Sequence, residues 1–122
     1  MGKDILKKIL RDQNHTTKAK KVSLHSLVPN QYIIIDVREP QVFQNTPHMQ
    51  GALNISSLEK LRIFCQEHQN QSILLVCNGG AQAAEYGSSL VESGLKNIFM
   101  LDEYLQIIAE YFPLTYPNQG DL

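Results

Sequence analysis

The sequence has little cysteine and no long hydrophobic run, and both absences narrow the class of protein. Its 122 residues include two cysteines, Cys65 and Cys77, which are too few for a disulfide framework. They also do not form the paired Cys-x-x-Cys motifs that are typical of a zinc site. The expected location is therefore a reducing compartment, the cytoplasm. No apolar run approaches the roughly 20 residues of a membrane span. The lysine-rich start also lacks the apolar core of a secretory signal.

Positive charge is concentrated at the N-terminus. Residues 1–21 hold seven of the eleven Lys and Arg and two acidic residues, a balance of +5, whereas the remainder has a balance of −6. A basic arm can bind nucleic acid, an acidic lipid surface or an acidic protein surface, and a protein partner for it stays open. The arm lacks the interleaved aromatic side chains of single-strand binders, so nucleic acid is not expected. Its simplest interpretation is a solvated helix end with a linker.

Two continuous apolar runs predict the fold class. Residues 32–36 and 73–77 are rich in β-branched side chains and do not alternate with polar ones, which is typical of strands covered on both faces. Shorter strands are predicted at 52–55 and 98–101, with an edge strand within 22–27. Strands of this kind, separated by helices, predict an α/β protein with a doubly wound parallel sheet.

Helical periodicity fills the gaps between the strands. Helices are predicted over residues 4–11, 57–68 and 81–93. A last helix is predicted to begin after Asp102, its N-cap, and to stop at Pro113. Ser56 or Ser57 would cap the second helix, and Gly94 stands where a helix end favours a left-handed residue. We expect a basic helix and linker over residues 1–21, one domain over 22–115 and a tail over 116–122.

The loop after the second apolar run is the strongest candidate site. In open α/β sheets, ligands bind beyond the carboxyl ends of the strands, and here Cys77 is followed by two glycines and a helix start. Glycines let successive N–H groups converge, and a helix N-terminus adds unpaired donors. We expect a cradle of backbone amides around the thiol, from Asn78, Gly79, Gly80, Ala81 and Gln82. Helix-end stabilisation would raise the thiolate fraction from about 7% to roughly 10–30% near neutral pH.

The alternative for Cys77 is a buried strand-end cysteine that acts as a small hydrophobe. A cysteine-dependent phosphatase is excluded, because the sixth residue after Cys77 is Ala83. An arginine is needed there to clamp the phosphoryl group.

Four segments, in the same order, resemble the rhodanese-like domain family. The segments of this chain are YIIIDVREP (residues 32–40), PHMQGALNI (47–55), VCNGGAQAA (76–84) and GLKNIFML (94–101). They are similar, in turn, to the family's strand with its DVRE signature, its GHIPGAINI segment, its YCRSGNRSA active loop and its GYKNVYVLDGG approach to the last helix. Together they lie within about residues 22–112.

The resemblance implies a five-stranded parallel sheet flanked by helices and thiosulfate-type sulfurtransferase chemistry, and we expect neither a cofactor nor a metal. By this resemblance Cys77 attacks a sulfane-sulfur donor and carries the sulfur as a persulfide, which a thiol or cyanide acceptor then takes. The donor and acceptor are small molecules or proteins. Asp36 and Arg38 match signature positions and are expected to brace the loop. His48 also matches and is expected to be a hydrogen-bonded structural histidine.

The chain departs from the family pattern at two places. Asn78 and Ala81 stand where the family's loop usually has arginines, and an acidic segment follows Leu101. Fewer cations predict a weak reaction with thiosulfate or a less charged donor. Two functions therefore stay open: a single-domain sulfurtransferase or sulfur carrier, and a catalytically inactive module for protein interaction or regulation.

Overall fold

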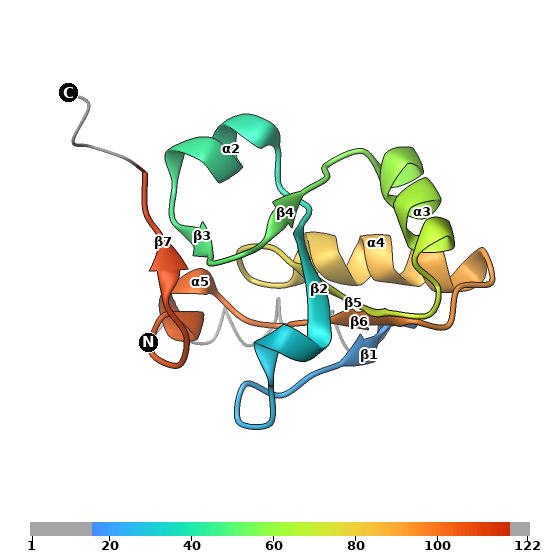
Figure 1. Ribbon diagram of the computed structural model, residues 1–122, viewed down its shortest axis with the longest axis horizontal. Coiled ribbons are helices and arrows are strands. Elements are labelled where there is room, and N and C mark those ends of the chain that lie inside the picture. The colour runs from blue at the N-terminus through green and yellow to red at the C-terminus, as the bar shows by residue number, and fades with distance from the viewer. Residues whose placement is uncertain (1–15, 118–122) are drawn as a thin grey trace.

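A five-stranded parallel sheet forms the centre of the protein (Figure 1). The computed structural model describes residues 16–117, so the helix predicted over 4–11 lies outside the described residues. In spatial order the strands are β1 (Lys20–Lys21), β6 (Ile98–Met100), β5 (Ser72–Val76), β2 (Tyr32–Asp36) and β4 (Leu53–Asn54). Every neighbouring pair is parallel. The expected fold class is confirmed.

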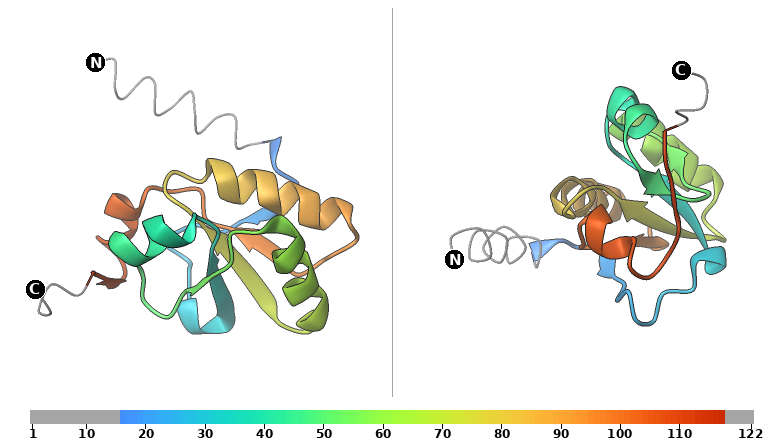
Figure 2. Two further views of the ribbon diagram at one scale, coloured as in Figure 1. Left: turned by 90° about the horizontal axis from the view of Figure 1, so that it is seen from above. Right: turned by 90° about the vertical axis from the view of Figure 1, so that its left-hand side faces the viewer.

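Both faces of the sheet are buried, which explains why the two apolar runs do not alternate. Ile35 and Leu75 face a core shared with α3 (Leu58–Glu67) and α4 (Ala81–Glu92). Their neighbours Ile34 and Leu74 face a second core. That core includes residues of the short helix α5 (Leu105–Ile108), and Figure 2 shows the helices around the sheet. Among residues 16–117 no helix has the length and apolar character needed to cross a membrane.

Local signals place the ends of the two long helices. The Ser57 hydroxyl accepts a hydrogen bond of 3.3 Å from the Lys60 amide at the start of α3, as expected of an N-cap. Gly94, after α4, has a φ of +99°, the left-handed conformation predicted for it.

Two boundary predictions are wrong because strand and helix ends depend on distant partners. The edge strand is Lys20–Lys21 and not within 22–27: Lys20 pairs with Phe99, and the chain turns at Ser23 soon afterwards. The last helix begins after Tyr104, without a cap from Asp102. The Asp102 carboxylate instead accepts from Lys21 Nζ at 3.0 Å.

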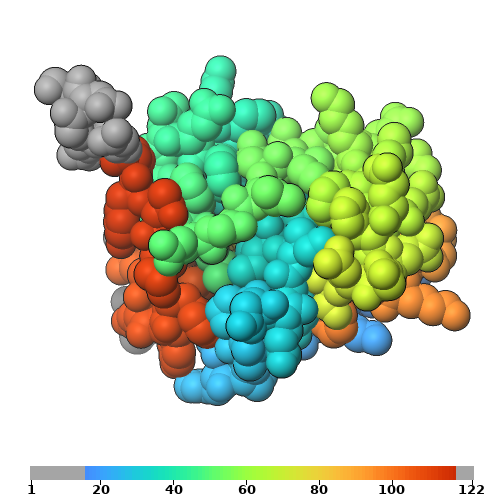
Figure 3. All heavy atoms as spheres, in the orientation of Figure 1, coloured from blue at the N-terminus to red at the C-terminus, as the bar shows by residue number. Residues whose placement is uncertain are grey.

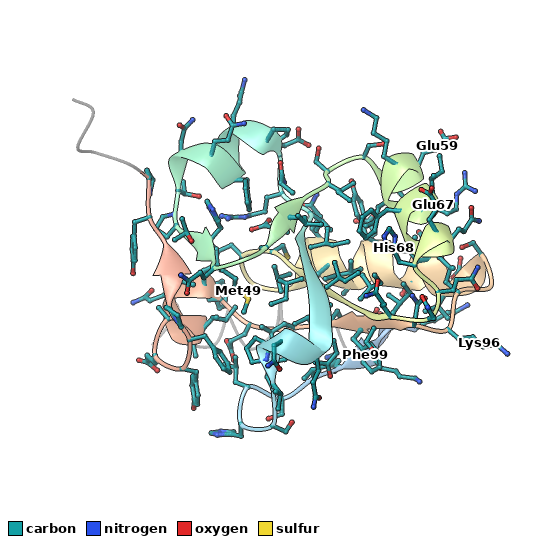
Figure 4. The ribbon with its side chains drawn as sticks, viewed as in Figure 1. Met49, Glu59, Glu67, His68, Lys96 and Phe99 are labelled. Carbon is teal, nitrogen blue, oxygen red and sulfur yellow. The ribbon has the colours of Figure 1, made fainter. Side chains whose placement is uncertain are left out.

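The sequence patterns did not predict several short elements. These are η2 (Pro29–Gln31), α2 (Pro40–Asn45) and an antiparallel pair of β3 (His48–Met49) with β7 (Leu114–Thr115). Met49 of β3 is buried in the second core (Figure 4). In Figure 3 the C-terminal segment, in red, lies beside the green segment that contains β3. The pairing of β3 with β7 thus brings residues 114–115 beside the connection from β2 to β4.

Candidate functional site

Cys77 lies directly after β5, in the four-residue loop that leads into α4. Gly79 and Gly80 have φ values of +99° and +88°, and Gly80 is the N-cap of α4. Residues other than glycine rarely adopt a positive φ. The two glycines therefore allow the chain to turn tightly from strand to helix around the cysteine.

Backbone amides approach the sulfur of Cys77, and two of them, from Gly80 and Gln82, are among the five expected from the sequence. Sγ accepts from the Ala83 amide at 3.4 Å, and the amides of Gly80 and Gln82 also stabilise its thiolate. Two of these donors belong to the first turn of α4, where backbone N–H groups lack helical partners. The arrangement suits a negatively charged sulfur.

Burial outweighs these amides in the resting protein. Cys77 is 3% exposed, and burial raises the pKa of its thiol above the ordinary value, with a smaller rise from the charge of Asp36. The three amides lower the pKa but do not reverse the shift. The prediction that the loop increases the thiolate fraction is therefore wrong for this conformation. Removing the thiolate from water costs more free energy than its interaction with the helix N-terminus gains.

Asp36 and Arg38 form a buried ion pair beside this loop. The Arg38 guanidinium donates to the Asp36 carboxylate through Nε and Nη2, at 2.8 to 3.1 Å. Its Nη1 donates to Thr46 Oγ1 and its Nη2 also reaches the Pro47 carbonyl. The pair thus closes the segment from β2 to β3, and Gln82 joins this segment to the cysteine loop by donating to the Val37 carbonyl at 2.9 Å.

The segment before α5 packs on the cysteine loop from the other side. The Gly79 amide donates to the Glu103 carbonyl at 3.2 Å, and the Leu105 amide donates to Asn78 Oδ1 at 3.0 Å. A Cβ at Gly79 would lie 3.0 Å from Tyr104 Cε1. Sequence reasoning missed Tyr104, and only the acidic, remodelled segment after Leu101 pointed to a change here.

His48 borders the segment closed by the ion pair, through Thr46, whereas Cys65 lies in α3. The His48 ring stacks on Phe43, with centroids 3.8 Å apart, and its Nδ1 lies 3.2 Å from the Thr46 carbonyl. Cys65 is fully buried in α3, and burial raises the pKa of its thiol to about 11, so it is a poor nucleophile. Within the described part of the chain, no three His, Cys, Asp or Glu side chains gather as a metal site requires.

Comparisons with known proteins find similarity over most of the chain. The family model described as Rhodanese-like domain matches residues 9–106. A thiosulfate sulfurtransferase, GlpE, of Pseudoalteromonas translucida (strain TAC 125) is 26% identical over 80 residues, which cover 66% of this chain and 75% of the relative.

Solved structures share the fold. Protein hp1203 of Helicobacter pylori 26695 is 29% identical with a TM-score of 0.72, over 80% of this chain and 89% of the other. A rhodanese-related protein of Thermoplasma volcanium is 24% identical with a TM-score of 0.62, over 79% of this chain and 97% of the other. The second likeness concerns the fold alone.

Proposed function

Because the chain belongs to the rhodanese-like domain family, we propose that it is a sulfurtransferase or sulfur carrier that forms a persulfide on Cys77. One observation carries the proposal: the sulfur of Cys77 accepts from the Ala83 amide at 3.4 Å, and the amides of Gly80 and Gln82 also stabilise its thiolate. A cradle of this kind stabilises negative charge on sulfur without a side-chain cation. Of the other amides expected in the substrate loop, those of Asn78 and Ala81 stay part of the proposal, whereas the Gly79 amide donates to the Glu103 carbonyl.

The proposed reaction has two displacement steps. The Cys77 thiolate attacks the outer sulfur of the donor, a new S–S bond forms, and the donor's S–S bond breaks; from thiosulfate the leaving group is sulfite. The product is a persulfide anion on Cys77, held by the loop amides. An acceptor thiolate, or cyanide, then attacks the terminal sulfur and releases the Cys77 thiolate.

Proton loss and donor charge limit the proposed reaction. Because burial raises the pKa of Cys77, its thiol must lose a proton to water or to the donor before it attacks. Asn78 and Ala81 supply no positive charge, and Arg38 is paired with Asp36. A dianion such as thiosulfate therefore has little to bind, and we expect it to be a weak donor.

The described residues Asp36, Arg38 and His48 have positioning roles in this proposal. The ion pair holds the segment that receives Gln82, whereas His48, the first residue of β3, stacks on Phe43 of α2. Both cysteines are free thiols, which suits a reducing compartment, and we place the reaction in the cytoplasm. The donor and acceptor are small molecules or proteins.

An inactive interaction module is the second candidate, favoured by the neutral loop and the raised pKa of Cys77. A turnover assay separates the two. Sulfur transfer from thiosulfate and from an organic thiosulfonate to dithiothreitol is measured for the full chain and for Cys77→Ser and Cys65→Ser. The proposal predicts turnover that Cys77→Ser abolishes and Cys65→Ser retains. Equal rates for the full chain and Cys77→Ser, with both donors, would favour the module.

A further inference from the structure

The side chain of Asn78 makes a contact that an arginine at this position could not make. Its Oδ1 accepts a hydrogen bond of 3.0 Å from the Leu105 amide, at the start of α5. An arginine side chain has five N–H donors and no acceptor, so it could not receive this amide. The asparagine therefore removes a cation from the cysteine loop and adds a bond between that loop and α5.

The start of α5 depends on this bond, because it lacks a side-chain cap of its own. Its N-cap residue is Tyr104, which makes no side-chain capping hydrogen bond. The amides of a first helical turn have no partner within the helix. Leu105 is 7% exposed, so its amide has little access to water and needs a partner in the protein. Asn78 supplies that partner from another part of the chain.

Further contacts fasten the residues before α5 on both sides. On the loop side, the Gly79 amide donates to the Glu103 carbonyl at 3.2 Å, and a Cβ at Gly79 would lie 3.0 Å from the Tyr104 ring. On the other side, the Asp102 carboxylate accepts from Lys21 Nζ at 3.0 Å. In Figure 2 the yellow loop before α4 lies beside the orange segment that leads into α5. The cysteine loop is thus attached to a segment that is itself held to the edge of the sheet.

We propose that the Asn78 side chain is a positioning residue for Cys77, which acts by fastening the cysteine loop to residues 102–105. The inference rests on the proposed function of Cys77 and adds a side chain that fixes the geometry of its loop. Asn78 directly follows Cys77, and the three amides that stabilise the thiolate come from the next six residues. Preorganised donors stabilise developing charge because they are already in place. Without the bond to Leu105, the loop opens more readily, which exposes the thiol and moves the amides away from it.

Two reactions of Cys77 should therefore change in opposite directions in Asn78→Ala. Alkylation by iodoacetamide, in a Cys65→Ser background, requires only an accessible thiol. Its rate should rise about two- to tenfold, the factor that corresponds to one hydrogen bond. Sulfur transfer from benzenethiosulfonate to dithiothreitol also requires the amides in place, and its kcat should fall by roughly tenfold. Asn45→Ala, at an exposed position of α2, is the matched control and should change neither rate.

Hydrogen exchange of the Leu105 amide reports the bond itself, without any reaction of Cys77. Asn78→Ala should speed this exchange about two- to tenfold. Asn78→Asp keeps an acceptor oxygen at the same place and should retain the protection of the amide. Urea denaturation identifies the conditions in which each variant is folded, and the exchange is compared there. Equal exchange in the full chain and in Asn78→Ala would show that Asn78 does not hold α5, and would overturn the inference.

The two rates give the remaining outcomes. A kcat for sulfur transfer that does not fall in Asn78→Ala would overturn the positioning role, even if alkylation becomes faster, because the bond would then only cover the thiol. Alkylation that is no faster in Asn78→Ala would show that the bond does not keep the loop closed, and would overturn the inference as well. Faster alkylation and exchange in Asn78→Ala, with no sulfur transfer by the full chain, would support the hold of Asn78 on the loop and overturn the proposed function.

Discussion

The side-chain amide of Gln82 donates a hydrogen bond of 2.9 Å to the backbone carbonyl of Val37. Val37 lies between Asp36 and Arg38, and Gln82 is in the first turn of α4. This bond joins the cysteine loop to the segment closed by the buried ion pair. We therefore expect a change at the ion pair to reach the cysteine loop through this bond.

Arg38→Ala should strongly destabilise the protein. The Asp36 carboxylate is fully buried, and losing the guanidinium leaves its charge without its main partner, at a cost of about 3–5 kcal/mol. Urea denaturation measures the free energy of unfolding. Arg62→Ala is the control, because Arg62 faces Glu59 at 3.6 Å on the surface, where a pair contributes about 1 kcal/mol or less. Similar losses for the two variants would contradict the assignment.

Gly79→Ala should destabilise the protein more than Gly51→Ala. Both glycines have positive φ, +99° and +82°, so both variants incur a backbone cost of about 1–2 kcal/mol. Only at Gly79 does the new methyl group also meet the Tyr104 ring, at 3.0 Å. The extra loss should disappear in a Tyr104→Ala background, a double-mutant cycle measured by denaturation. An extra loss that persists there would show that Tyr104 is not its cause.

Ala81→Arg should raise activity toward thiosulfate. Ala81 is exposed at the start of α4, and an arginine there would add a charge-assisted hydrogen bond to the donor, worth roughly tenfold in kcat/KM. Ser89→Arg adds the same charge two turns further along the helix and should have little effect. An unchanged or lower rate for Ala81→Arg would contradict the explanation given for the weak thiosulfate reaction.

The pH dependence of alkylation should reveal the raised pKa of Cys77. In a Cys65→Ser background, the rate with iodoacetamide should still be rising above pH 9, since burial holds the thiol neutral to higher pH than the reference value of 9.0. The folded state then binds this proton more tightly than the unfolded state. The free energy of unfolding should accordingly fall as the pH rises past 9. A rate that levels off below pH 8 would indicate a depressed pKa instead.

The parallel sheet and the cysteine loop could be predicted because their signals are local. The apolar runs at 32–36 and 73–77 carry the strand pattern within themselves, and Gly79 and Gly80 stand beside Cys77. The structure bears out the strands, and Gly79 and Gly80 take left-handed conformations that only glycine adopts readily. In these segments the local preference and the tertiary environment agree.

The features that were missed depend on segments far apart in the sequence. β3 pairs with β7 across more than sixty residues, and Lys21 pairs with Asp102. Local sequence patterns therefore predict neither contact. The direction of the Cys77 pKa was also missed. It follows from how deeply the packed loop buries the thiol, and the order of residues in the loop does not reveal that burial.

The most direct measurement is the intact mass of the protein after incubation with thiosulfate or with benzenethiosulfonate and removal of excess donor. Formation of a persulfide adds about 32 Da. The proposed function predicts this adduct on the full chain and on Cys65→Ala, and its absence from Cys77→Ala. An unchanged mass with both donors, or an adduct that Cys77→Ala retains, would contradict the claim that Cys77 carries the transferred sulfur.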